Sequence, residues 1–578
     1  MSGYFHSITL DYEKCMGCTN CIKRCPTEAI RVHGGKAKII GERCIDCGEC
    51  IRVCPYNAKI AVTDTLDKLS EFKYKIALPG PTFYAQFKEE ENVENILDAF
   101  LSIGFDDVFE VALAEEVLSF MTRHYLSTNK YKKPLISSFC PAVLRLMQIK
   151  FPDLLSQVSP FMTPREVAAM LAKEEAVKRK GIPYKDIGVF SISLCPARVT
   201  EIKQPMGLKT SAIDGVINIS LVYKDILKEL TKNHKKEKNM NLQKATGIGM
   251  SWGYLTGEAR ALNYGSVLAV CSIQYVASVL EEVERGELKD VDFLELRACS
   301  GGCVGGPLGI QNPFVGRVKL KYFVEKYRTK TPYYQEKEMS DFYQQGRFIS
   351  TEPILPRPIM MLDEDMSKAL LKMERLDKIT NELPGLDCGA CGAPSCQSFA
   401  EDIIRGLAVD TDCIIKLKKK GQILAEEVLD LMRKTPPAMG DDSLKEEGEG
   451  KINDGGIKLT LQEIKELLDA EVLVGHEQLS KEVNRAFVAD LMSDVLAFAT
   501  SGSLLITGLT NPQVVRTADV LDIAAVIMGR GKSPTPEALK LAQESNIPIL
   551  TTKFILFEIS GRLHARGIRG CIEKVGST

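Results

Sequence analysis

The sequence predicts a multidomain α/β protein, and three observations support this prediction. With 578 residues the chain exceeds the roughly 100–200 residues of one domain, so about three to five domains are expected. Over residues 73–330, and again after residue 457, short apolar runs typical of strands alternate with amphipathic helical stretches. The 18 cysteines gather in groups, which indicates metal ligands rather than disulfides in a cytosolic chain.

Composition disfavours several partners. The contents of 45% hydrophobic and 26% charged residues are typical of globular proteins. The net charge of -2 gives no overall attraction to nucleic acid or to a membrane surface. No apolar run reaches the roughly 18 residues that a membrane span needs, and the first residues lack the basic and apolar regions of a signal peptide. We therefore expect a cytoplasmic protein with no membrane span and no nucleic-acid partner.

Residues 1–65 contain two copies of the run C-x2-C-x2-C-x3-C-P. This spacing is the bacterial two-cluster ferredoxin pattern, in which the fourth cysteine of each run ligates the cluster of the other run. Zinc is the alternative, but zinc has no use for eight thiolates in doubled register. We therefore expect a ferredoxin-like domain that carries or stores electrons on two 4Fe-4S clusters, one held by Cys15, Cys18, Cys21 and Cys54, the other by Cys25, Cys44, Cys47 and Cys50.

Residues 73–330 are expected to form an α/β domain with strands at 75–79, 134–138 and 186–191 and a helix over 93–103. Four dispersed cysteines follow its apolar runs: Cys140, Cys195, Cys299 and Cys303. The carboxyl ends of strands are where such sheets place their sites. Cys299 and Cys303 stand among glycines, which let the backbone pack closely against a bulky inorganic ligand.

The segments 137–141, 193–201 and 298–306 resemble the three signature segments of the iron-iron hydrogenases, TSCCP, MPCxxKxxE and ACxGGCxxGGG. Together with the ferredoxin-like module, the resemblance covers residues 1–330. In that family these cysteines hold the H-cluster, a 4Fe-4S cubane joined through one cysteine to a diiron unit. By motif position, the resemblance implies that Cys140, Cys195, Cys299 and Cys303 ligate the cubane and that Cys303 bridges to the diiron unit.

The sequence also departs from the family pattern. Phe139 replaces the cysteine that delivers protons, and a benzyl group exchanges no proton. Arg198 replaces the lysine that hydrogen-bonds a cyanide, which keeps a cation but changes its reach and geometry. Arg297 replaces a methionine before the third segment, and a weak alignment places Met121 and Thr122 where active enzymes carry the glutamates of a proton channel. Loss of a positioned relay is expected to slow turnover.

These departures resemble the sensory, low-activity branch of the family. The first hypothesis is therefore a protein that binds H2 and protons at the H-cluster, turns over slowly and relays electrons to other redox or hydrogenase subunits, or to a signalling kinase or phosphatase. A second hypothesis is a non-catalytic electron-transfer or scaffold subunit that binds only 4Fe-4S clusters. A hydrogenase-like domain with a bare cubane or no metal, as in eukaryotic relatives of iron-sulfur assembly, also stays open.

After a connector at 331–383, residues 384–434 carry a third group, spaced C-x2-C-x4-C-x16-C: Cys388, Cys391, Cys396 and Cys413. The pattern resembles a small iron-sulfur domain of electron-transfer and corrinoid proteins. Gly389 and Gly392 permit tight turns whose amides can bond cluster sulfurs. We expect one 4Fe-4S cluster here, with zinc as the alternative.

An acidic linker is expected at 435–456, followed by an α/β domain at 457–570 that resembles the DRTGG domain. Strands are expected at 504–508, 524–528 and 547–551, with a helix that starts at Pro536 and is capped by Thr535. The loop 529–533 imitates half of a Walker motif, but Val526 stands where its first glycine is needed, so nucleotide hydrolysis is not expected. Effector binding at this loop and homodimer formation remain alternatives.

Overall fold

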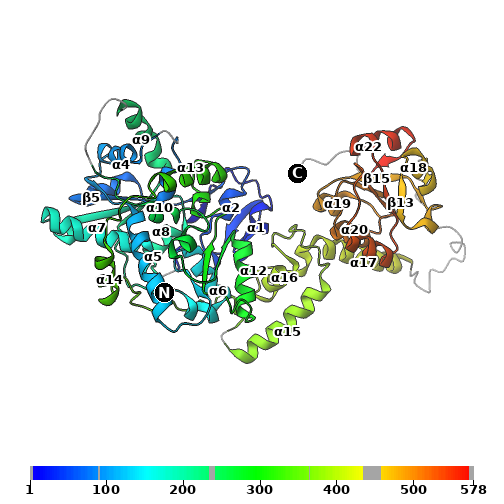
Figure 1. The fold of residues 1–578 in the computed structure, drawn as a ribbon. Coiled ribbons are helices and arrows are strands. Elements are labelled where there is room, and N and C mark those ends of the chain that lie inside the picture. The colour runs from blue at the N-terminus through cyan, green and yellow to red at the C-terminus, as the bar shows by residue number, and fades with distance from the viewer. Residues whose placement is uncertain (1–3, 89–90, 234–240, 364, 434–456, 572–578) are drawn as a thin grey trace, which may run out of the picture. The chain divides into compact units, whose positions relative to one another are not determined.

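The computed structural model describes residues 4–571, except 89–90, 234–240, 364 and 434–456. The chain divides into two compact units, residues 1–361 and residues 362–578 (Figure 1). The expected acidic linker lies outside the described residues. Within the described part, no helix combines the length and the apolar character that crossing a membrane requires.

The first unit begins with a small module of short elements. Strand β1 (Ile8–Leu10) pairs antiparallel with β4 (Lys59–Ala61), and β2 (Ile30–His33) forms a hairpin with β3 (Lys36–Ile39). Two helices, α1 (Asn20–Arg24) and α2 (Glu49–Arg52), pack against each other. With so few apolar residues, the cysteines themselves form part of the buried core.

Two parallel sheets build the rest of this unit. The first has the order β6-β5-β8-β9, with strands Asp107–Val108, Tyr74–Pro79, Ile187–Ser193 and Gly215–Asn218. The second has the order β10-β11-β7, with strands Val267–Cys271, Phe293–Arg297 and Leu135–Ile136. Every residue of β8 is buried, as expected for a central parallel strand covered on both faces. The expected strands near 75, 134 and 186 are therefore confirmed.

Helices surround these sheets (Figure 1). The helix expected at 93–103 is present as α4 (Val93–Ser102), where the Asn92 side chain accepts a hydrogen bond from the Glu94 amide. The remaining helices of the unit are α3 (Pro81–Tyr84), α5 (Val111–Thr128), α6 (Pro141–Lys150), α7 (Pro164–Lys180), α8 (Ala197–Lys203), α9 (Ile219–Asn233), α10 (Gly247–Ser251), α11 (Gly257–Leu262), α12 (Ile273–Glu284), α13 (Pro313–Lys326) and α14 (Glu336–Gln344).

The stretch expected as a connector, 331–383, is divided between the two units. Its first part folds onto the first unit, where Tyr334, Met339 and Phe348 are buried in the main core and Ile349 bridges to Phe161. Its second part contains α15 (Met366–Glu382), which packs on α16 (Cys396–Ile404) in the second unit. Aromatic residues spaced through a polar stretch are what tie its first part down.

The second unit continues with α17 (Ile414–Arg433) and then a six-stranded sheet. The sheet order is β13-β18-β17-β16-β15-β19, with strands Glu471–Val474, Ile549–Thr551, Ala525–Met528, Leu504–Thr507, Arg485–Val488 and Arg569–Gly570. All neighbours are parallel except β13 with β18. A short pair, β12 (Leu459–Thr460) with β14 (Glu482–Val483), lies outside this sheet.

Helices cover both faces of this sheet. Helices α18 (Leu461–Leu467) and α22 (Leu556–Ala565) pack on one face, and α19 (Met492–Phe498), α20 (Pro512–Val520) and α21 (Pro536–Glu544) pack on the other. Thr535 accepts a hydrogen bond from the Ala538 amide, so the predicted cap and the proline at the first helical position are confirmed. The expected βαβ unit is confirmed by the parallel pairing of β17 with β18.

Candidate functional site

The structure gathers sixteen of the cysteines around four pockets. Two pockets lie in the N-terminal module: one is lined by Cys15, Cys18, Cys21 and Cys54, the other by Cys25, Cys44, Cys47 and Cys50. A third is lined by Cys140, Cys195, Cys299 and Cys303, and a fourth, in the second unit, by Cys388, Cys391, Cys396 and Cys413. None of the 18 cysteines forms a disulfide. Ligation of clusters by these groups stays a prediction.

The central pocket is built at the carboxyl ends of strands from both sheets of the first unit. Cys140 follows β7 and precedes α6, Cys195 follows β8 and precedes α8, and Cys299 follows β11. Cys303 starts a 3-10 turn whose preceding residue, Gly302, has a φ of 97° and packs against the Tyr254 backbone. A side chain at residue 302 would collide with that backbone, so this glycine permits the close packing that places Cys303 in the pocket.

This pocket is larger than the other three. It contains about 640 Å³ of space free of protein atoms, part of it open to solvent, against about 290, 330 and 330 Å³ for the other cysteine-lined pockets. Besides the cysteines, its wall contains one aromatic ring, three guanidinium groups and one carboxyl group: Phe139, Arg165, Arg198, Arg297 and Glu115. The additional space is therefore bordered by charged groups rather than by more thiols.

Phe139 is held by cations on its ring and by hydrogen bonds on its backbone. The guanidinium carbon of Arg297 lies 3.7 Å from the ring centre and that of Arg198 lies 5.0 Å from it, which are cation-π distances. The Phe139 carbonyl accepts a hydrogen bond from Arg198, and its amide donates one to the Ser137 hydroxyl. Trp252 packs at 5.5 Å between ring centres. The ring is thus a fixed part of the pocket wall.

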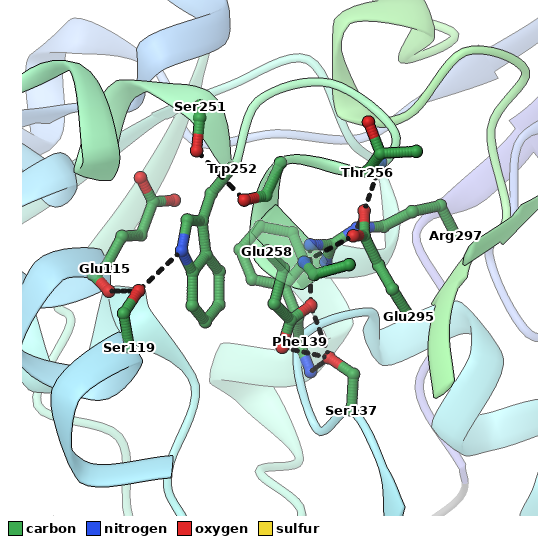
Figure 2. A network of polar contacts seen from close by, with 12 residues as sticks. Glu115, Ser119, Ser137, Phe139, Ser251, Trp252, Thr256, Glu258, Glu295 and Arg297 are labelled. Atoms are coloured by element: carbon green, nitrogen blue, oxygen red, sulfur yellow. Dashed lines mark hydrogen bonds and ion pairs between the residues drawn. The ribbon is translucent and has the colours of Figure 1, made fainter. Parts of the chain in front are cut away.

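A buried ion network holds Arg297 in place (Figure 2). Its Nη2 atom lies 2.8 Å from a carboxylate oxygen of Glu258, and its Nε atom lies 3.4 Å from Glu295. Ser137 donates to Glu258, and the amides of Thr256 and Ala259 donate to Glu295. Burial works against the charge of Arg297, but the two carboxylates more than offset it and raise the pKa of the guanidinium. The Nη1 atom of Arg297 has no hydrogen-bond partner among the described residues.

The buried thiols of the central pocket need positive charge to ionise. Burial raises the pKa of Cys195 to about 12 and that of Cys303 to about 11, although arginines lower both values. A metal centre supplies such charge, because a coordinating thiol is deprotonated outright. The chemistry of the donor set, with the unpartnered Nη1 of Arg297 beside it, therefore fits an anionic metal cluster.

Glu115 is a pocket residue that sequence reasoning missed. Met121 and Thr122, placed at the proton-channel positions by the sequence, are buried but do not line the pocket, whereas Glu115 on the same helix, α5, does. Burial raises the pKa of Glu115 to about 8, and its Oε2 atom has no hydrogen-bond partner in the described part. An acidic pair, Glu115 and Glu116, within an apolar run was the available signal.

One cysteine of the N-terminal module also reaches the central pocket. Cys47 lines both its own pocket and the central one. The contact is fixed by neighbouring residues: a Cβ on Gly48 would stand 2.3 Å from Pro307, and Asp46 accepts hydrogen bonds from the Ser7 amide and the Thr200 hydroxyl. The two pockets are therefore adjacent, with Cys47 in their common wall.

In the second unit, the four-cysteine group lies between α15, α16 and the start of α17. Gly389 and Gly392 have φ values of 81° and 84°, so the tight turns expected at these glycines are confirmed. Asp387 accepts a hydrogen bond from the Cys396 amide and fixes the start of α16.

The loop 529–533 stands at the carboxyl end of β17. Asp490, just after strand β15, which β16 separates from β17, accepts hydrogen bonds from Thr507 and Gly508 and pairs with Arg530 at 3.2 Å. Lys532 donates to the Gly508 carbonyl. The loop is therefore tied to two adjacent strand ends, the edge at which open α/β sheets bind ligands.

Comparison with known proteins gives four family matches. Residues 73–264 and 222–307 match the C-terminal domain of the iron-only hydrogenase large subunit, and residues 7–55 match a 4Fe-4S dicluster domain. Residues 383–415 match a putative Fe-S cluster domain, and residues 463–565 match the DRTGG domain.

Individual relatives are more distant. The chain is 25% identical over 303 residues to the NADP-reducing hydrogenase subunit HndD of Solidesulfovibrio fructosivorans, covering 50% of this chain but only 46% of that protein. It is 24% identical over 406 residues to iron hydrogenase 1 of Clostridium pasteurianum, covering 58% and 70%. Among solved structures, HydA1 of Chlamydomonas reinhardtii has 16% identity and a TM-score of 0.39, covering 50% of this chain and 97% of that one.

The matched domains define an iron-sulfur protein of the hydrogenase type. The matches support an FeFe-hydrogenase-like chain, with a 4Fe-4S dicluster domain before the hydrogenase domain, and an Fe-S domain and a DRTGG domain after it. Iron-sulfur cofactors are therefore part of this protein.

Proposed function

We propose that this protein binds H2 at an H-cluster, turns it over slowly and relays electrons through 4Fe-4S clusters as an H2 or redox sensor. Cys140, Cys195, Cys299 and Cys303 would hold the H-cluster, with Cys303 bridging to its diiron unit. When bound, that unit supplies the iron chemistry that binds and cleaves H2. The three remaining cysteine groups would each hold one 4Fe-4S cluster.

The size and lining of the central pocket carry this proposal. The central pocket is larger than the pockets beside the other three cysteine groups, each of which would hold a cubane. Arg165, Arg198 and Arg297 border it, and cationic donors suit a diiron unit with anionic ligands. An unpartnered guanidinium nitrogen beside that space is what such a ligand would satisfy.

The slow turnover rests on Phe139. Its ring is held between two guanidinium groups where the resembling enzymes carry a proton-exchanging thiol. Glu115 is an acid in the same wall, but its Oε2 atom has no hydrogen-bond partner among the described residues. Without a thiol beside the reacting position, proton delivery loses a step that is normally worth about 10²–10⁴-fold.

The alternative function is a non-catalytic electron-transfer or scaffold subunit of a larger hydrogenase or redox complex. It is favoured by one observation: Phe139 and Arg297 together fill part of the wall beside Cys303 with bulky, tightly held side chains. A cubane would suffice for that role.

Electrons are proposed to pass between the central site and the N-terminal clusters through the wall at Cys47. The outer pocket, with Cys15 and Cys18, is bordered by Met16 and Tyr56, whose exposed fractions are 66% and 47%. Exposed apolar side chains beside a redox site suit a docking partner. That partner is proposed to be another redox or hydrogenase subunit, or a signalling kinase or phosphatase. The 18 free cysteines suit the reducing cytoplasm.

The DRTGG domain is proposed to be a regulatory module of this protein, acting either by effector binding at the loop 529–533 or by homodimer formation. The ties of Arg530 and Lys532 to the ends of β15 and β16 support the first option, because a ligand there would contact three strand ends at once. Sedimentation of the full chain with and without nucleotides separates the two options.

Infrared spectroscopy tests the central proposal. After co-expression with hydrogenase maturation enzymes, the protein is expected to show stretching bands of metal-bound CO and cyanide. Absence of these bands from protein whose iron and sulfide contents show full cubane loading would reject the H-cluster and leave the scaffold function.

A further inference from the structure

Lys59 carries a charge that the described residues leave uncompensated. Its side chain is 3% exposed, and its Nζ atom has no hydrogen-bond partner there. No ion pair joins it to a described carboxylate within 4.0 Å either. An isolated buried ammonium group is strongly unfavourable, so it is expected to have a negative partner.

The strand that contains Lys59 buries a charged residue and exposes its apolar neighbour. In β4, Lys59 is buried while its neighbour Ile60 is 44% exposed. Side chains alternate along a strand, so a one-residue shift would bury the isoleucine and free the lysine. In the observed register, with Lys59 opposite Leu10 of β1, the hydrophobic burial of Ile60 is incomplete. Something inside the module must favour the ammonium group.

The ammonium group lies where both cysteine groups of the module can interact with it. Lys59 lines the pocket of Cys15, Cys18, Cys21 and Cys54. Its positive charge also acts on Cys21 of that group and on Cys50 of the other group. Those two cysteines belong to α1 and α2, which pack against each other. Lys59 thus lines the pocket of one predicted cluster and acts electrostatically on a ligand of the other.

We propose that Lys59 is a tuning cation shared by the two N-terminal 4Fe-4S clusters, which makes both easier to reduce. Each cluster with four thiolates is an anion, and the electron it accepts adds one negative charge. A fixed positive charge nearby therefore stabilises the reduced form more than the oxidised form. The same clusters supply the negative charge that the described residues do not place beside Lys59. This inference rests on the cluster-binding part of the proposed function.

Potentiometric titration of the full-length, cluster-loaded protein, followed by electron paramagnetic resonance, tests the proposal. The two N-terminal signals are assigned by their loss in Cys18→Ser and Cys47→Ser. In Lys59→Met, the ratio of reduced to oxidised cluster at a fixed potential is expected to fall about tenfold for both clusters, a shift of about 59 mV for one electron. Lys59→Arg should keep the ratio within about threefold, and Lys38→Met, which removes an exposed charge from the same module, should leave it unchanged.

An unchanged ratio in Lys59→Met, or a change in only one of the two clusters, would overturn the proposal. If Lys59→Met does not load clusters, Lys59→Gln is titrated instead and judged by the same outcomes. If the wild-type protein contains no N-terminal clusters, the proposed function fails; clusters with unshifted potentials reject only the role of Lys59.

Discussion

The guanidinium group of Arg297 stacks on the ring of Phe139, with 3.7 Å between the guanidinium carbon and the ring centre. Both residues depart from the motifs of the hydrogenases that the chain resembles. Since Arg297 is also paired with two buried carboxylates, the two departures form one packed unit (Figure 2). Substitutions of the two residues therefore test different properties. Replacing Phe139 tests proton transfer, and replacing Arg297 tests the stability of the first unit.

Replacing Phe139 by cysteine is expected to raise H2 turnover by about 10²-fold, because a thiol restores proton exchange beside the reacting position. H2 evolution from reduced methyl viologen measures the effect, with infrared bands confirming an intact H-cluster. Phe139→Ala is the matched control, since it opens the same space without a thiol. Equal rates in the two variants would show that space, not proton transfer, limits turnover.

Replacing Arg297 by methionine is expected to destabilise the first unit by about 3–5 kcal/mol, because Glu258 and Glu295 then remain buried without their cation. The double variant Arg297→Met with Glu258→Gln should recover part of this loss. Arg285→Met, which breaks an exposed pair with Glu282, should cost at most about 0.5 kcal/mol. Denaturant unfolding measures all three, and a loss as small as that of the control would contradict a buried network.

Stability of the first unit is expected to fall as the pH rises from about 5 to 8. Burial raises the pKa of Glu116 and of Glu166 to about 7. The folded protein keeps these two protons up to about pH 7, whereas the glutamates of the unfolded chain release theirs above a pKa of about 4.3. The stabilisation from the two groups is therefore fully present below about pH 4.3 and is lost as the pH rises through about 7. Each group is expected to account for on the order of 2–3 kcal/mol.

The pH effect is measured as the difference in melting temperature between wild type and Glu116→Gln at pH 5, 6, 7 and 8. The melting temperature of the variant should rise relative to that of the wild type as the pH increases. Glu284→Gln, at an exposed position on α12, should show no such trend. A difference that does not change with pH would contradict a raised pKa at Glu116.

Replacing Cys413 by serine is expected to remove about four iron atoms per chain, because one 4Fe-4S cluster of the second unit loses a ligand. Cys571→Ser is the matched control: Cys571 is a buried thiol of the same unit that lies outside the four cysteine-lined pockets. Iron and sulfide analysis measures the change. Equal iron contents in the two variants would rule out Cys413 as a ligand.

Local features of the fold were predictable from sequence. The cap at Thr535 and the glycine turns at residues 389 and 392 depend on a few neighbouring residues, and the structure has them as expected. The grouping of the cysteines followed from ligand spacing, which the short range of metal-thiolate bonds imposes on the sequence.

Long-range packing was not predictable. Tyr334 and Phe348 stand in a polar stretch that suggests a connector, and only their partners in the main core reveal why that stretch is folded. The contact of Arg297 with Phe139 joins residues 158 positions apart, and the buried lysine in β4 contradicts its own strand pattern. Such features depend on tertiary contacts that leave no period in the sequence.

The position of Cys47 in the wall between two pockets has a magnetic consequence. Two paramagnetic centres held on either side of one cysteine side chain would relax each other's electron spins. The resonance lines of the reduced N-terminal cluster predicted at Cys25, Cys44, Cys47 and Cys50 should therefore broaden whenever the central site is also paramagnetic. They should sharpen when the central site is diamagnetic. The spectrum of one centre would then report the state of the other, without any change in the shape of the protein.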